Sequence, residues 1–191
     1  SLVNEEGTFE TDREGFSLEP FLYFGRLMTW GDARTKQTLE KGYLPIPHVD
    51  WEMKDLALRV TLFDSGPQGK SLLYARYRIE NTGASARDGK FYLAIRPFQV
   101  NPPWQKLNMK GGPSPIRKIA YDGRTARVND AKSIFPLTTP SGFGATAAAA
   151  GDIVNFLSEG AWPPKADVDD PESFASGAFS YDLHIPAGGA T

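Results

Sequence analysis

Cysteine is absent from this sequence, and histidine and methionine are scarce, with two and three residues among 191. Without cysteine the chain can form no disulfide, no thiolate nucleophile and no cysteine zinc site. This absence does not identify the compartment, because many exported bacterial proteins also lack cysteine.

An excess of charge of one sign is also missing. The 21 Lys and Arg residues are scattered among 23 Asp and Glu residues, which gives a formal net charge of −2. Nucleic-acid binding requires a clustered basic face. We therefore expect no nucleic-acid partner.

Long apolar runs are absent as well. No stretch approaches the roughly 20 apolar residues of a membrane helix, and residues 1–6 lack the basic start and apolar run of a signal peptide. We expect no membrane partner. The start at Ser1 and the end just after a strand-like run indicate a segment of a longer multidomain polypeptide, with residues 1–191 forming a single domain.

The alternation of apolar and polar residues predicts strands over 56–63, 73–79, 91–96 and 179–185. In the third of these, Phe91, Leu93 and Ile95 lie on one face and Tyr92 and Arg96 on the other. The apolar phase of the four strands predicts a set of core residues. This set is Leu58, Val60, Ala75, Tyr77, Leu93, Ile95, Leu183 and Ile185.

Turn signals connect these strands. Residues 81–85, Asn-Thr-Gly-Ala-Ser, are expected to reverse the chain and pair 73–79 with 91–96 as antiparallel neighbours. The dipeptide Asp122-Gly123 predicts a hairpin between 116–121 and 124–128, and 132–137 continues it as a meander.

Helix signals are few. Asp152 is placed to cap a short helix through Leu157, with Gly160 just beyond its end, and a second short helix is expected at Asp170-Pro171. The pattern as a whole predicts an all-β fold, a two-sheet antiparallel β-sandwich with one or two short helices.

Motifs for known catalytic chemistry are weak. A Ser-His-Asp arrangement would need His48 or His184, and no Gly-x-Ser-x-Gly elbow accompanies either, which favours surface or structural histidines. The acidic run 167–170 could bind calcium or cap a helix, but it lacks the spacing of a calcium loop, and no metal is assigned. Phosphate-loop and dinucleotide fingerprints are missing, so no cofactor is expected. No motif singles out two of the acidic residues as the carboxylate pair of a glycosidase.

The most unusual segment is 96–105, in which three prolines stiffen a loop that follows a strand. Its aromatic, amide and guanidinium groups suit a saccharide, which offers C–H faces and hydroxyls. Two alternatives stay open: a rigid corner that plugs the sandwich, and a face that docks on another domain. The candidate contact residues are Arg96, Gln99, Asn101, Trp104 and Gln105, with Trp30 and Trp51 as further contributors.

Four segments carry a resemblance to a known family: 44–51 with Leu-Pro-Ile-Pro and Trp51, 74–81, 93–105 and 174–178. With them the chain resembles the β-sandwich of large bacterial proteins in which a discoidin-like domain, a sandwich and a six-hairpin glycosidase-like toroid follow one another. The resemblance implies a galactose-mutarotase-like supersandwich that packs beside the toroid and helps to shape its cleft. The catalytic acids would lie outside this chain, in a periplasmic or extracellular protein.

The resulting hypothesis is a non-catalytic accessory domain of a carbohydrate-active protein. Its partners would be a glycan or neighbouring domains of the same polypeptide. The alternatives are a mutarotase-like or glycosidase-like enzyme domain with its own site, and a protein-interaction module.

Overall fold

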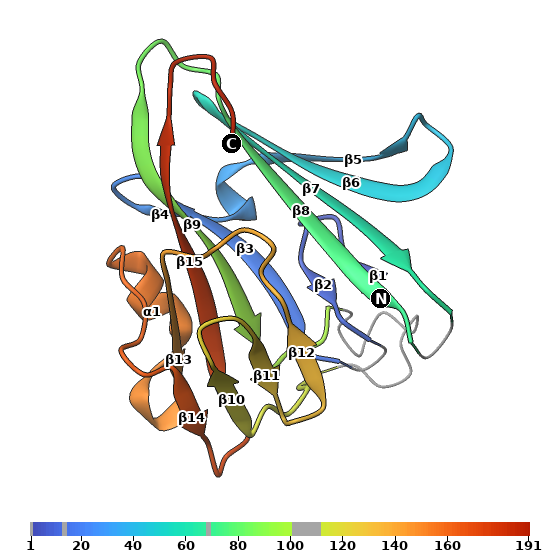
Figure 1. Ribbon diagram of the computed structural model, residues 1–191. Helices are drawn as coiled ribbons and strands as arrows, with labels where there is room; N and C mark the ends of the chain where they lie inside the picture. Colours follow the sequence, from blue (N-terminus) through green and yellow to red (C-terminus); the bar gives the residue numbers. More distant parts are fainter. Residues whose placement is uncertain (1, 13–14, 68–69, 101–111) are drawn as a thin grey trace.

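The computed structural model describes residues 2–12, 15–67, 70–100 and 112–191 (Figure 1). About 54% of the chain is strand and about 7% is helix. All the strand pairs are antiparallel, apart from one isolated parallel bridge between Ile116 and Phe174. The predicted all-β class is confirmed, and the arrangement is sandwich-like.

One layer is a seven-stranded sheet. Its order is β1 (Leu2–Val3), β2 (Phe9–Glu10), β3 (Ser17–Tyr23), β9 (Arg87–Arg96), β15 (Ser176–Ile185) and β13 (Gly142–Thr146), with β4 (Leu27–Met28) paired to β3. The central strands β3, β9 and β15 come from distant parts of the chain.

Two four-stranded sheets face this layer (Figure 1). The first is β5 (Arg34–Glu40), β6 (Leu44–Met53), β7 (Leu56–Ser65) and β8 (Leu72–Asn81). The second is β12 (Lys132–Ile134), β11 (Ala126–Val128), β10 (Lys118–Tyr121) and β14 (Asp167–Asp169). The helices among the described residues are η1 (Trp30–Asp32), η3 (Ala148–Ala150) and α1 (Ile153–Ser158).

The main core lies between the layers, because side chains from all three sheets belong to one buried cluster. Phe91, Leu93 and Ile95 of β9 meet Leu58 and Val60 of β7 in this cluster. Apolar burial of this kind is the principal stabilising term of such a sandwich. The predicted core positions Leu58, Val60, Leu93, Ile95 and Ile185 are buried, and Tyr77 and Leu183 are partly buried against them.

Ala75 is a wrong core assignment. It has the same strand phase as Tyr77 and the buried Ile79, but it is exposed to solvent. The reason is its place on β8, the edge strand of its sheet, where the opposite layer covers Tyr77 and Ile79 but not Ala75.

The expected pairing of the strands around the turn at 81–85 is also wrong. β8 pairs with β7, whereas β9 pairs with β3 and β15, so this turn carries the chain from one layer to the other. The side chain of Asn81 holds the turn: Nδ2 donates to the Ser85 and Ile185 carbonyls at 2.8 and 3.0 Å, and Oδ1 accepts from Gly83 N–H at 3.0 Å.

The face of β9 that the sequence predicts to be polar is also buried over part of its length. Tyr92 and Ala94 are fully buried beneath α1, which packs Ile153 and Leu157 against them. Strand alternation assumes that one face meets water. Here a second, smaller core covers that face.

The predicted hairpin at Asp122-Gly123 and the predicted helix cap at Asp152 are confirmed, whereas the second predicted helix is not. The hairpin at Asp122-Gly123 joins β10 to β11, and β12 completes the meander. Asp152 caps α1 by accepting from Val154 N–H at 2.8 Å. The helix expected at Asp170-Pro171 is a turn instead. The buried Asp170 carboxylate accepts from the backbone N–H groups of residues 148, 172 and 174, which fixes this turn.

Candidate functional site

The C-terminal end of β9 brings charged groups from three elements together. Arg96 Nη1 donates to Glu19 Oε2 of β3 at 2.7 Å, and Nη2 lies 3.5 Å from Asp152 Oδ2, at the start of α1. The side chains of Arg96 and Glu19 are only 21% and 14% exposed. A partly buried pair is screened less by solvent than a surface pair, so this contact holds Arg96 in place.

The segment that follows Arg96 leaves the sheet through a closed stem. Phe98 forms a bridge with Pro113, Gln99 N–H donates to the Gly112 carbonyl at 2.9 Å, and Ser114 N–H donates to the Pro97 carbonyl at 2.9 Å. These bonds fix Phe98 and Gln99 relative to β9.

An aromatic pair links this stem to the turn that contains Phe174. Phe98 is 40% exposed, and its ring centroid lies 6.5 Å from that of Phe174. The Arg96 guanidinium carbon lies 5.2 Å from the centre of the Phe98 ring, within the range of a cation–π contact. The stem therefore presents an aromatic surface beside a fixed guanidinium group.

Buried polar atoms without partners gather at the same end of the large sheet. Among the described residues, Thr11 Oγ1, Arg96 Nε and Gln99 Oε1 are buried and form no hydrogen bond. Beside them, the carboxylate of Glu10 is 2% exposed and accepts from Val100 N–H at 2.7 Å. An unpaired buried polar group costs about 1–3 kcal/mol, so a cluster of them calls for an explanation.

The structure brings together only some of the predicted contact residues. Arg96 and Gln99 lie on the same stem, whereas Asn101, Trp104 and Gln105 lie outside the described residues. Trp30 and Trp51 lie in other parts of the fold.

Trp51 belongs to the main core. It is fully buried, and its indole N–H donates to the Glu6 carbonyl at 2.9 Å. No face of this ring is open to a ligand.

Trp30 is 43% exposed in η1, beyond β4. β4 pairs with the far end of β3, Leu22 with Met28, whereas Arg96 pairs with Ser17 at the near end. The register therefore separates Trp30 from Arg96 along the length of β3.

Sequence reasoning missed the acidic partners of Arg96. Glu19 lies on the face of β3 opposite the buried Leu18 and Leu22, and this alternation was available in the sequence. Its proximity to Arg96 depends on the pairing of strands 77 residues apart, which no local pattern specifies.

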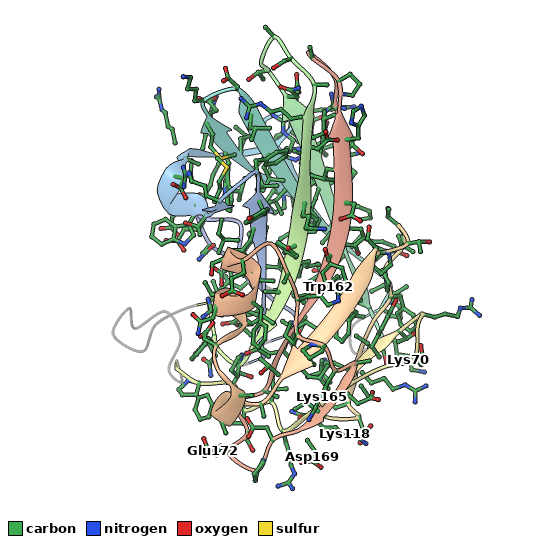
Figure 2. All side chains as sticks on the ribbon, turned by 90° about the vertical axis from the view of Figure 1, so that its left-hand side faces the viewer. Lys70, Lys118, Trp162, Lys165, Asp169 and Glu172 are labelled. Atoms are coloured by element: carbon green, nitrogen blue, oxygen red, sulfur yellow. The ribbon has the colours of Figure 1, made fainter. Side chains whose placement is uncertain are left out.

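A polar hollow of about 500 Å³ opens on the sheet of β10 and β11. Arg117 Nε lies 3.1 Å from Asp169 Oδ1, and Lys118 Nζ lies 3.2 Å from Asp130 Oδ2. Asn129 Oδ1 accepts from the Arg117 and Lys118 N–H groups at 2.8 and 3.1 Å. Lys118 and Asp169 lie at the lower end of the molecule in Figure 2, away from α1. The charged groups of this hollow satisfy one another.

The carboxylates of the acidic run 167–170 do not meet at one site. Asp167 accepts from Tyr121 N–H, Asp169 pairs with Arg117, and Asp170 binds the backbone of its own turn. Within the described part of the chain, no group of three or more His, Asp or Glu side chains is arranged to hold a metal ion.

The two histidines lie in different sheets. The buried His48 of β6 contacts Thr61 Oγ1 at 2.8 Å through Nδ1 and Glu40 Oε2 at 3.1 Å through Nε2. This order of groups is that of a catalytic triad, but Thr61 is a buried residue in the middle of β7. Its neighbouring backbone groups belong to the ladders with β6 and β8, so they are not aimed at a developing oxyanion. His184 is exposed and contacts Asp88 at 2.6 Å.

The face of β9 that carries Arg96 also carries the buried hydroxyl of Tyr92, beside that of the buried Ser180 on β15. They are opposite each other in the register of β9 and β15. Burial raises the pKa of Tyr92, which keeps its phenol protonated. α1 and the segment containing Trp162 cross this face (Figure 2), and they cover the pair.

No helix among the described residues is long and apolar enough to cross a bilayer. Comparison with known proteins adds no identification: no protein-family model matches the chain, and neither does any curated protein. The fold class is therefore shown by the structure alone, and the site is characterised by its own geometry.

Proposed function

We propose that this chain is a non-catalytic accessory β-sandwich domain of a carbohydrate-active protein, and that its stem at Arg96, Phe98 and Gln99 contacts glycan. The observation that carries the proposal is Phe98, which is 40% exposed and lies 5.2 Å from the guanidinium carbon of Arg96, next to Gln99 in the chain. Pyranose rings pair C–H faces with aromatic rings and hydroxyls with amide or guanidinium groups.

The arrangement suits binding better than catalysis. Glu19 and Asp152 are the acids nearest to Arg96, and both interact with its guanidinium group. A glycosidase needs a pair of carboxylates that face the scissile bond, whereas these two face one guanidinium group. The catalytic acids of the parent protein would then lie in another domain, in the periplasm or outside the cell.

The proposal is tested by calorimetry of the chain with neutral and acidic oligosaccharides. We expect Phe98→Ala and Gln99→Ala each to weaken binding at least about tenfold, or ~1.4 kcal/mol. Trp104→Ala belongs in the same series, because the sequence predicts that Trp104 carries most of the binding energy of a contact surface here, about 2 kcal/mol or more.

Phe63→Ala is the matched control, because Phe63 is also 40% exposed but lies on β7. Equal losses for Phe98→Ala and Phe63→Ala, or no saccharide binding at all, would contradict the proposal.

Two alternative functions give different outcomes in the same experiments. An enzyme domain would hydrolyse aryl glycosides and lose that activity on mutation of one of its own Asp or Glu residues. A docking face would leave saccharide binding absent, and Phe98→Ala would weaken the binding of a neighbouring domain supplied separately.

A further inference from the structure

β8 is an edge strand with a short second ladder at one end. On the side away from β7, Ile79 and Thr191 exchange two backbone hydrogen bonds, each of 2.9 Å, and Asn81 N–H donates to the Gly189 carbonyl at 2.9 Å. Ala190 forms an antiparallel bridge with Glu80. Figure 1 shows the end of the chain beside the upper end of β8. Residues 189–191 thus cover only the last part of a ten-residue strand.

The rest of this edge has a defined hydrogen-bonding pattern. Alternate residues of an antiparallel strand direct their N–H and C=O groups to opposite sides. Since Ile79 and Asn81 bind residues 189–191, the groups of Leu73, Ala75 and Tyr77 point to the same edge. Within the described part of the chain, this stretch of β8 pairs only with β7. An uncovered edge is a template for another strand.

The side chains along this edge differ between its two faces. On the inner face, Ala75 is exposed, while Tyr77 packs its ring 4.7 Å from that of Phe91. The space between the two layers is therefore open to solvent at Ala75. An apolar side chain of an added strand could pack there, at the edge of the main core.

The outer face of the same stretch is basic. Arg78 Nη2 lies 3.7 Å from Glu80, at the limit of an ion pair, and Arg76 forms no ion pair with any described residue. Acidic side chains on a neighbouring strand would complement both guanidinium groups.

We infer that the edge of β8 from Leu73 to Tyr77 is a docking site for an extended segment of a partner protein. The segment pairs antiparallel with β8, along the same edge with which residues 189–191 pair. This mode of peptide recognition is called β-augmentation. It alternates acidic residues opposite Arg76 and Arg78 with apolar residues opposite Ala75 and Tyr77. The inference is independent of the glycan proposal, which concerns the stem after β9 in the large sheet.

Amide hydrogen exchange by NMR tests the free edge first. In the free protein, the amides of Leu73, Ala75 and Tyr77 should exchange at least about tenfold faster than those of Tyr74, Arg76 and Arg78, which face β7. Equal protection of the two sets would overturn the inference, because the edge would already be occupied.

The binding probe is a five-residue segment with acidic first, third and fifth positions and valine between them. Joined to Thr191, it faces Arg78, Tyr77, Arg76, Ala75 and Tyr74 in turn, and the linkage raises its effective concentration to the millimolar range. We expect it to slow exchange at Ala75 and Tyr77 at least about tenfold, while Leu73, which lies beyond the reach of five residues, stays unprotected. The same segment with lysine in place of the acids is the charge control, and it should protect less.

Two variants separate docking from general stabilisation. Ala75→Pro removes an N–H group that β7 does not use, so it should abolish the protection while the amides that face β7 stay protected. Arg76→Glu with Arg78→Glu should reverse the preference between the acidic and the lysine segments. Persistence of protection in Ala75→Pro would overturn the inference. So would edge protection that rises with protein concentration without any segment, since the occupant would then be a second copy of the chain.

Discussion

Asn81 Nδ2 donates to the Ile185 carbonyl at 3.0 Å, so one buried amide joins the end of β8 to the end of β15. The same group also reaches the carbonyls of Ser85 and Pro186. These contacts lie where the chain passes from one layer to the other.

We predict that Asn81→Ala destabilises the protein by about 1–3 kcal/mol, because truncation leaves buried carbonyls and the Gly83 N–H without their partner. Chemical denaturation measures the change. Asn155→Ala on the exposed side of α1 is the control and should alter stability by less than about 0.5 kcal/mol. Similar effects of the two substitutions would show that Asn81 does not hold the crossover.

Ile95 and Leu93 test the core between the layers. They are 0% and 8% exposed, and Ile95→Ala or Leu93→Ala should cost about 2–5 kcal/mol, because each leaves a cavity in packed apolar surroundings. Leu72, 55% exposed, provides the matched control, and Leu72→Ala should have little effect on the unfolding midpoint. A loss below about 0.5 kcal/mol for both core variants would contradict the described packing.

Gly144 tests the packing on the outer face of the large sheet. A Cβ atom at this position would overlap the carbonyl oxygen of Pro163, which is backbone and cannot rotate away. Gly144→Ala should therefore destabilise the protein by about 1–3 kcal/mol, as overpacking does. At Gly31 the nearest atom, Thr29 Oγ1, is 3.4 Å from such a Cβ, so Gly31→Ala should be tolerated. Thermal unfolding of both variants decides between these outcomes.

Asp32 gives a prediction about pH. Its carboxylate accepts from Thr29 N–H at 2.9 Å and from Arg26 Nη1 at 2.7 Å, and these two hydrogen bonds, in that order, lower its pKa. A group whose pKa is lower in the folded state binds fewer protons there. Its contribution to stability is therefore present above the unfolded pKa, about 3.9, and is lost as the pH falls through the folded pKa.

We accordingly expect Asp32→Asn to lower the melting temperature at pH 6 and to have progressively less effect between pH 4 and pH 2. Glu172→Gln is the control, because the Glu172 carboxylate forms no ion pair with any described residue. A melting-temperature difference for Asp32→Asn that stays constant from pH 6 to pH 2 would rule out the carboxylate as its source.

Local chemistry accounts for the elements that could be predicted. The alternation through Leu58 and Val60 specifies a half-buried strand, the Asp122-Gly123 dipeptide specifies a tight reversal, and Asp152 supplies a cap. Each of these signals acts within a few residues, so the sequence alone carries it.

The remaining features depend on distant partners. Residues 81–85 have the composition of a hairpin turn, but the partner of β9 is decided by β3 and β15, which are far away in the chain. Burial of Tyr92 depends on α1, about 60 residues later, and the contact of Arg96 with Glu19 depends on the strand register. For this reason the sequence located Arg96 and Gln99 as candidate contacts but not the acids around them.

The strand order β3, β9, β15 also constrains how the protein reaches its fold. Its central ladders join residues 17–23 to 87–96, and 87–96 to 176–185, so the mean sequence separation of contacts is high and folding should be slow. During synthesis, β9 and β13 must wait for residues 176–185 before β15 can be inserted between them. Until then both strands expose open edges, and open strand edges are prone to aggregate.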